Sequence, residues 1–199
     1  NGPEQYDDIK AGPAFVLKVS KGDYRMWYEA IDSSLDPDGA GANGYNAVAY
    51  ATSSNGRAWT KRGRVFTPLA LGTWENSEVC PNAIVWNPTT QLWHMYYHGG
   101  NNNPANNRRI GVATSPNLTN GGTWTRYGSG PVITPAGGDL WVADSRVIRV
   151  GDGDWRAWVL ARDAGGLGHV VLYTSTDGLA WVRSGSVLAK GAAGQWDEV

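Results

Sequence analysis

The chain has 199 residues, enough for one domain, and its 17 Lys and Arg against 18 Asp and Glu leave a formal net charge of −1. A chain with this charge balance has no excess of positive charge with which to bind nucleic acid. Its apolar runs of at most about five residues are too short to span a membrane. The single cysteine, Cys80, excludes an internal disulfide framework and any metal site built from several cysteines. Eleven tryptophans and 27 glycines, with only 18% charged residues, favour many short strands joined by turns.

A short phrase occurs three times along the chain. It reads ATSSNGRAWT from Ala51, ATSPNLTNGGTWT from Ala113 and TSTDGLAWV from Thr174. Asn55-Gly56 and Asp177-Gly178 are hairpin signals, because Asn, Asp and Gly tolerate the positive φ of a tight turn. Each phrase therefore predicts a strand, a turn and a second strand that opens with tryptophan.

Two more strand patterns precede each phrase. Apolar runs lie at 13–18, 81–86 and 145–150, and aromatic alternating runs lie at 24–29, 93–98 and 155–160. One unit thus holds four strands in about 60 residues, and no segment has a convincing helical period. A four-stranded antiparallel sheet repeated radially is a β-propeller blade. We therefore predict an all-β propeller with three four-stranded blades and the start of a fourth.

The units span residues 1–63, 64–130 and 131–190, and residues 191–199 read as the opening of another blade. Propellers close with four to eight blades, so three blades do not make an ordinary ring. We expect either that the protein continues past Val199 or that the chain assembles with another copy. Exposed edges and apolar radial faces would favour such self-association.

The phrase YRMWYEA … VAYATSSNGRAWTKRG … WENSEVCPNAIVWNPTTQLWHMYYHGG … IGVATSPN resembles the five-bladed propellers of the glycoside hydrolase superfamily. That superfamily includes arabinanases and β-xylosidases (families 43 and 62) and invertases and levansucrases (families 32 and 68). The resemblance covers nearly all 199 residues. It is more specific for the architecture than for any one reaction, because this phrase is scaffold sequence.

The resemblance implies that the catalytic carboxylates stand where the innermost strands of successive blades begin. On this basis Asp8 is expected to be the base or nucleophile, Glu78 the general acid, and Asp144 the transition-state stabiliser. Asp144 resembles the Asp of an RDP motif but has ADS around it. Glu78 resembles the Glu of an ECP-type motif with one inserted residue, Val79, and the order of these two blades is the reverse of the invertase-like order. Since side chains alternate along a strand, the inserted residue decides which way Glu78 points.

Glycoside hydrolysis needs two carboxyl groups roughly 5–10 Å apart, one to protonate the leaving oxygen and one to activate water or attack the sugar. We expect Asp8, Glu78 and Asp144 to line one cavity, with the pKa of one carboxyl raised by its neighbours. A structural role is the alternative for the acids that recur at the start of each blade, namely Asp7, Asp8, Glu75 and Asp197. An acid repeated in every blade is expected to bond turn amides rather than to catalyse.

Aromatic residues outside the repeated phrase are candidates for stacking against sugar rings, namely Trp74, Trp86, Trp141 and Tyr97. His98 directly precedes a Gly- and Asn-rich loop, residues 99–103. We expect this loop at the opening of the central tunnel of the propeller, where His98 and the loop would contact a ligand. The repeated Trp59, Trp124 and Trp181 predict packing between blades. His94 and His98 share one strand face, yet two satisfied histidines are expected rather than a metal pair, and Cys80 reads as a small buried apolar residue.

The predicted function is paired-carboxylate hydrolysis of a poly- or oligosaccharide, with no organic cofactor or metal and no nucleic-acid or membrane partner. The alternatives are a non-catalytic carbohydrate-binding propeller and a structural fragment that assembles with itself. An extracellular or periplasmic location is expected for a protein that meets such polymers.

Overall fold

The computed structural model describes residues 7–32, 45–70, 72–101, 107–192 and 194–195, and these residues form strands almost throughout. Twelve strands follow one another along the chain: β1 Lys10–Ser20, β2 Asp23–Asp32, β3 Tyr45–Ser53, β4 Thr60–Phe66, β5 Glu78–Asn87, β6 Leu92–Gly100, β7 Arg109–Ser115, β8 Thr125–Arg126, β9 Asp139–Gly151, β10 Asp154–Asp163, β11 Gly168–Ser175 and β12 Val182–Leu188. The described helical structure is one 3₁₀ turn, Thr119–Gly121. No helix in this part of the chain has the length and apolar character needed to cross a membrane.

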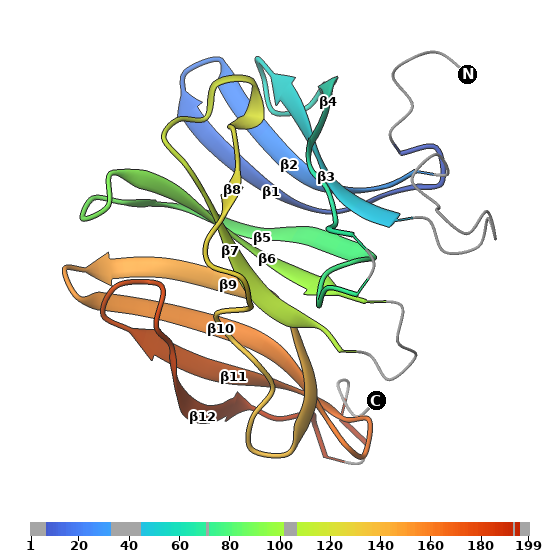
Figure 1. Cartoon of the computed structure of the whole chain (residues 1–199), viewed down its shortest axis with the longest axis vertical. Coiled ribbons are helices and arrows are strands. Elements are labelled where there is room, and N and C mark those ends of the chain that lie inside the picture. The colour runs from blue at the N-terminus through green and yellow to red at the C-terminus, as the bar shows by residue number, and fades with distance from the viewer. Residues whose placement is uncertain (1–6, 33–44, 71, 102–106, 193, 196–199) are drawn as a thin grey trace.

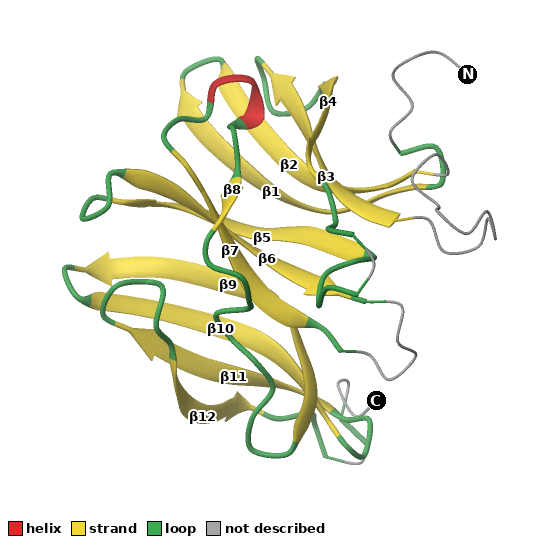
Figure 2. Ribbon diagram, viewed as in Figure 1, coloured by secondary structure: helices red, strands yellow, loops and turns green. Residues whose placement is uncertain are grey.

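The strands form three antiparallel blades of four, which fan out in chain order in Figure 1. Each strand pairs with the next one along the chain, from β1 to β4, from β5 to β8 and from β9 to β12. A single parallel bridge between Asn46 and Glu78 joins the first two blades into one sheet. The predicted all-β propeller of four-stranded blades is therefore confirmed (Figure 2). In the first blade β4 runs to Phe66, beyond the boundary expected at residue 63.

The repeated phrase folds as predicted because its serine and its Asn or Asp satisfy the turn. In the first blade the Ser53 hydroxyl accepts hydrogen bonds from the amides of Asn55 and Gly56. Ser175 does the same for Asp177 and Gly178 in the third blade. The glycines have φ of 72° and 75°, in the left-handed region that this position requires.

The core lies between neighbouring blades as well as within them. The Trp27 indole donates a hydrogen bond to the Gly121 carbonyl of the next blade, and the Tyr96 hydroxyl donates one to the Gly178 carbonyl. Trp124 packs on the cluster between the first two blades, and Trp181 on the cluster between the second and third, as predicted. Trp59 differs, since it packs on Tyr28 and neighbouring residues of its own blade.

An acid at the start of each innermost strand, or in the segment just ahead of it, pairs with a cation on the outermost strand of the same blade. The three pairs are Asp7 with Lys61 at 2.6 Å, Glu75 with Arg126 at 2.8 Å and Asp139 with Arg183 at 3.5 Å. The acid side chains are almost completely buried. These pairs support the structural reading of the repeated acids for Asp7 and Glu75, while Asp197 lies outside the described residues.

Each innermost strand carries a β-bulge at an equivalent place, where two of its residues face a single residue of the neighbouring strand. The bulges are Gly12-Pro13 opposite Glu29, Pro81-Asn82 opposite Tyr97, and Asp144-Ser145 opposite Val159. Bulges of this kind re-aim side chains and are frequent next to active sites. The first residue of the bulge is Gly12 in the first blade, Pro81 in the second and Asp144 in the third. Pro81 is therefore equivalent to Gly12, whereas the sequence pattern had aligned it with Pro13. Val79, the residue inserted in the second blade, lies ahead of the bulge.

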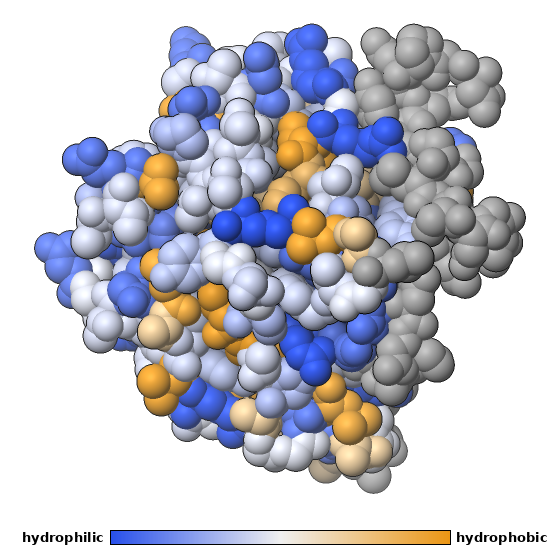
Figure 3. Space-filling model, in the orientation of Figure 1, coloured by the Kyte–Doolittle hydropathy of each residue, from blue (hydrophilic) through white to orange (hydrophobic). Residues whose placement is uncertain are grey.

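The surface is mainly hydrophilic on the face in Figure 3, where apolar side chains form small separate groups. Exposed apolar residues occur on several strands, among them Ile148 and Val150 on β9, and on β12, the outer edge strand of the third blade, they are Val182, Val187 and Leu188. This edge remains a candidate surface for the self-association proposed from the sequence.

Candidate functional site

Three side chains with different chemistry meet where β5 begins and β6 ends. Glu78 and Cys80 are two residues apart on β5 and so point to the same face of the strand. His98 lies directly opposite Cys80 on β6. The carboxylate oxygen, the thiol sulfur and an imidazole nitrogen lie within 4.8 Å of one another.

Glu78 is held by two cationic or hydrogen-bonding partners, one on each oxygen. His98 Nε2 lies 2.9 Å from its Oε1, and Arg108 Nε donates to its Oε2 at 3.0 Å. Gly100 pairs with Glu78 across the strands, and a Cβ there would lie 3.1 Å from Oε2. Because Gly100 has no side chain, Arg108 can reach the carboxylate. The inserted Val79 thus leaves Glu78 in this cluster, with 13% of its side chain exposed.

Asp144 comes to the same histidine from the third blade. Its Oδ1 lies 3.5 Å from His98 Nδ1, and 45% of its side chain is exposed. The bulge gives Asp144 a φ of 47°, an uncommon value for a residue with a side chain that Asp tolerates better than most. Glu78 and Asp144 therefore contact opposite nitrogens of one imidazole ring.

The electrostatics of Glu78 differ from the expectation of a carboxyl with a raised pKa. Burial would raise the pKa of Glu78, but hydrogen bonds and charge from His98 and Arg108 outweigh it and lower the pKa to about 2. Glu78 is therefore ionised at neutral pH and lacks the proton that a general acid donates. The general-acid role expected for Glu78 stays a prediction that this low pKa disfavours, because His98 and Arg108 rather than a second carboxylate lie against its two oxygens.

The first blade contributes Glu29 to the cluster. Buried Glu29 accepts hydrogen bonds from Asn46 at 2.6 Å and from the Cys80 thiol at 3.1 Å, and it pairs with Lys10. Asp8 is exposed in the segment ahead of β1, and its role as base or nucleophile stays a prediction. The sequence signal for Glu29 was a charged residue inside an aromatic strand, at a position where the other blades have Tyr97 and Val159.

Cys80 is buried and serves as a hydrogen-bond donor within this cluster. Burial, and then the negative charges of Glu29 and Glu78, raise the pKa of the thiol. His98 is fixed on its other side, since Asn82 Nδ2 lies 3.3 Å and the Asp144 amide 3.4 Å from Nδ1. With Nε2 donating to Glu78, Nδ1 is the nitrogen that accepts these two hydrogen bonds.

Three of the four aromatic candidates pack into the protein. Trp74 stacks on Tyr97 with ring centroids 6.0 Å apart, and Tyr97 is buried against Phe66. Tyr97 therefore offers no ring face to a ligand. Trp141 is also buried, with the Arg108 guanidinium 5.8 Å from its ring centroid. It thus lies beneath the residue that holds Glu78.

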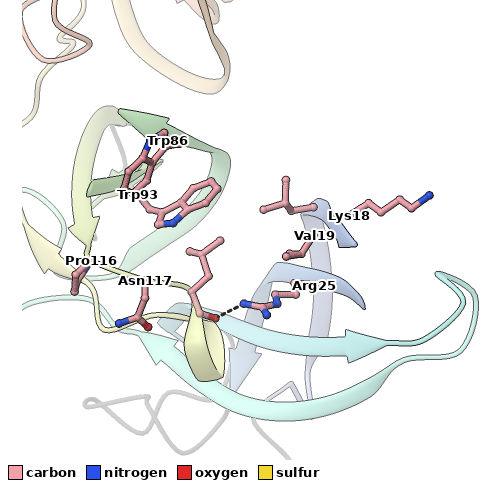
Figure 4. A pocket seen from close by; sticks show the side chains of 9 residues that line it. Lys18, Val19, Arg25, Trp86, Trp93, Pro116 and Asn117 are labelled. Carbon is pink, nitrogen blue, oxygen red and sulfur yellow. Dashed lines mark hydrogen bonds between the residues drawn. The ribbon is translucent and has the colours of Figure 1, made fainter. Parts of the chain in front are cut away.

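Trp86 is exposed, but at the far end of β5 from Glu78. With Trp93 it forms one wall of a groove of about 660 Å³, and Lys18 and Val19 form the other (Figure 4). Arg25 closes the floor by donating to the Leu118 carbonyl at 2.8 Å. Trp86 is 39% exposed, so its ring is accessible, yet it belongs to this separate groove and not to the carboxylate cluster.

Comparisons with known proteins place the chain in a family. A family model described as the glycosyl hydrolases family 32 N-terminal domain matches residues 16–198. A comparison with curated protein sequences gives no match.

Several solved structures share the fold at low sequence identity. A sucrose-6-phosphate hydrolase from Lactobacillus gasseri is 16% identical with a TM-score of 0.68, over 89% of this chain and 34% of that one. A variant of fructan 1-exohydrolase IIa from Cichorium intybus, in complex with 1-kestose, is 19% identical with a TM-score of 0.67, over 100% of this chain and 35% of that one. A glycosyl hydrolase from Bacteroides ovatus is 20% identical with a TM-score of 0.65, over 93% of this chain and 53% of that one.

The chain thus spans less than two thirds of the length of each of these structures. The match of the family model extends over nearly the whole chain, and the structural neighbours share its blades. The predicted resemblance is confirmed, and the chain belongs to the family of the glycosyl hydrolase family 32 N-terminal domain.

Proposed function

We propose that the chain supplies the paired carboxylates of a glycoside hydrolase that acts on a poly- or oligosaccharide, and that these are Glu78 and Asp144. The observation that carries the proposal is their meeting, from neighbouring blades, on opposite nitrogens of His98. Hydrolysis of a glycosidic bond needs two carboxyl groups near that bond, one to protonate the leaving oxygen and one to attack the sugar or activate water.

The two carboxyl groups have different environments and therefore different roles. Ionised Glu78 is the carboxylate that attacks the anomeric carbon or takes a proton from the attacking water. Asp144, the more exposed of the two, is the group placed to pass a proton to the glycosidic oxygen as the bond from that oxygen to the anomeric carbon breaks. The water hydroxyl ends on the anomeric carbon. His98 and Arg108 are positioning residues that hold Glu78 in place and in its charged form.

The test measures release of products from a panel of neutral oligosaccharides, including fructo-, arabino- and xylo-oligosaccharides, by chromatography. Glu78→Gln and Asp144→Asn keep the size of each side chain while removing its charge. Each is expected to lower turnover by about 10²–10⁴-fold, the range for loss of an acid or base. Asp154→Asn, an exposed change on β10, is the matched control and is expected to leave turnover unchanged. Unchanged turnover in both site variants would remove these residues from the mechanism.

A second candidate, carbohydrate binding without cleavage, is favoured by one specific observation. Both oxygens of Glu78 are already occupied by His98 and Arg108, which leaves the carboxylate fewer free lone pairs for chemistry. Calorimetry with the same oligosaccharides separates the two candidates. Binding of an oligosaccharide that wild-type protein leaves intact would support the binding role and contradict hydrolysis.

A further inference from the structure

We propose that Glu78, Cys80 and His98 form a binding site for a divalent transition metal, with Zn²⁺ as the best match to their donor atoms. The proposal concerns metal binding and does not depend on whether the chain cleaves sugars. It rests on how the blade brings three different ligand types to one point.

The strand register places the three donors together. Glu78 and Cys80 occupy alternate positions of β5, and His98 is the cross-strand partner of Cys80 on β6. His98 Nε2 lies 2.9 Å and Cys80 Sγ lies 3.8 Å from the same Glu78 oxygen, Oε1. Ligand atoms around one tetrahedral zinc ion are about 3.3–3.8 Å apart, as bond lengths of about 2.0–2.3 Å require. Small side-chain shifts would therefore bring all three atoms onto one ion.

The donor set also fits the metal. An imidazole nitrogen, a thiolate sulfur and a carboxylate oxygen are the three ligand types of protein zinc sites, whereas Mg²⁺ and Ca²⁺ prefer oxygen alone. Three protein ligands leave the fourth tetrahedral position open for water. Cys80 is buried and Glu78 nearly so, and the more exposed Asp144 lies beside the cluster, against His98.

Outer residues hold the ligands in the orientation that a metal needs. With metal on Nε2, the proton of His98 would move to Nδ1, where Asp144 Oδ1 lies 3.5 Å away and could accept it in place of the hydrogen bonds that Nδ1 accepts without the metal. Asn46 Nδ2 lies 4.0 Å from Cys80 Sγ and anchors Glu29, which lies beside the sulfur. Arg108 occupies Oε2 of Glu78 and leaves Oε1 for the ion.

Binding of the zinc ion releases one proton from the protein. The Cys80 S–H bond breaks, the sulfur forms a bond to Zn²⁺, and the proton passes to solvent. The negative charges of Glu29, Glu78 and Asp144 offset the charge of the ion. Because Glu78 Oε1 cannot bind zinc and attack a sugar at the same time, zinc is also expected to inhibit any turnover that uses Glu78.

The test uses Co²⁺ as a spectroscopic probe and Zn²⁺ for stoichiometry. Cys80 is the only cysteine in the sequence, so a thiolate-to-cobalt charge-transfer band can arise only from this site. We expect wild-type protein to develop that band, to lose it when Zn²⁺ is added, and to retain one equivalent of zinc after gel filtration, measured by mass spectrometry of the metal.

Cys80→Ser and His98→Gln are expected to abolish the cobalt band and to lower zinc retention at least tenfold. His169→Gln, in the third blade and outside the cluster, is the matched control and keeps both signals. Circular dichroism checks that each variant folds. If a variant does not fold, the metal titration of the wild-type protein still tests the proposal. Absence of the band in wild-type protein, or zinc retention unchanged in a folded Cys80→Ser variant, would overturn the proposal.

Discussion

Glu75, in the segment ahead of β5, accepts a hydrogen bond from Nε of Arg126 on β8 at 2.8 Å, with only 2% of the Glu75 side chain exposed. The pair ties the entrance of the blade to its outermost strand. Burial and the adjacent Glu75 raise the pKa of Tyr97, which packs beside the pair and remains neutral. Equivalent ion pairs in the other two blades show that the same kind of pair joins the start of each blade to its outermost strand.

Glu75→Gln is expected to destabilise the protein, because the Arg126 guanidinium would lose its anionic partner. A fully buried pair broken in this way costs about 3–5 kcal/mol, and we expect about 2–3 kcal/mol because Arg126 keeps some contact with solvent. Urea unfolding measures the change. Asp154→Asn breaks an exposed pair with Arg156 and is expected to change stability little, so equal losses in the two variants would contradict the role of Glu75.

Gly12→Ala is expected to disturb the first blade through Glu29. A Cβ at position 12 would lie 1.8 Å from Glu29 Oε2, so the buried carboxylate would have to leave its hydrogen bonds to Asn46 and Cys80. We expect a loss of about 1–3 kcal/mol in unfolding free energy, as for other overpacked sites. Gly130→Ala, where a Cβ meets nothing within 4 Å, is the control. The loss should shrink in a Glu29→Ala background, and an undiminished loss there would assign the strain to another contact.

His94 is expected to make stability depend on pH in the weakly acidic range. Burial lowers the pKa of His94 from 6.5 to about 4, so the unfolded chain binds a proton there more readily than the folded protein. The favourable contribution is complete above about pH 6.5 and is lost as the pH falls toward 4, by up to about 3 kcal/mol. Urea unfolding across this range should show a shallower loss in His94→Gln than in wild type. Equal slopes would show that His94 is not the group responsible.

Glu78 is expected to titrate near pH 2. The contribution of this depressed pKa to stability is present above about pH 4.5 and disappears as the pH falls toward 2. The carboxyl carbon of Glu78, followed by nuclear magnetic resonance, measures the midpoint directly. His98→Gln should raise that midpoint because it removes the imidazole that donates a hydrogen bond to Glu78 Oε1. A wild-type midpoint above 4.5 would instead restore Glu78 as a candidate general acid.

The sequence predicted the blades well because their signals are local. Ser53, Asn55 and Gly56 define a turn within four residues, and the same pattern at Ser175 predicts the same turn. It predicted the site less well. Glu78 and Asp144 were chosen from blade position and do meet at His98, whereas Glu29, which accepts a hydrogen bond from Cys80 in the same cluster, was missed.

The sequence by itself determined the number of strands, their turns and the three-blade repeat, since hydrophobic alternation and turn chemistry act over a few residues. Only the tertiary structure decided the register of β5 against β6, which sets Cys80 opposite His98 and places the inserted residue ahead of the bulge. Only the tertiary structure decided that a cation of the same blade, Arg108, reaches Glu78, and only the packing of neighbouring blades decided that Asp144 shares its histidine. These contacts join residues far apart in the chain, so their electrostatic effect on each carboxylate depends on distances that no local pattern encodes.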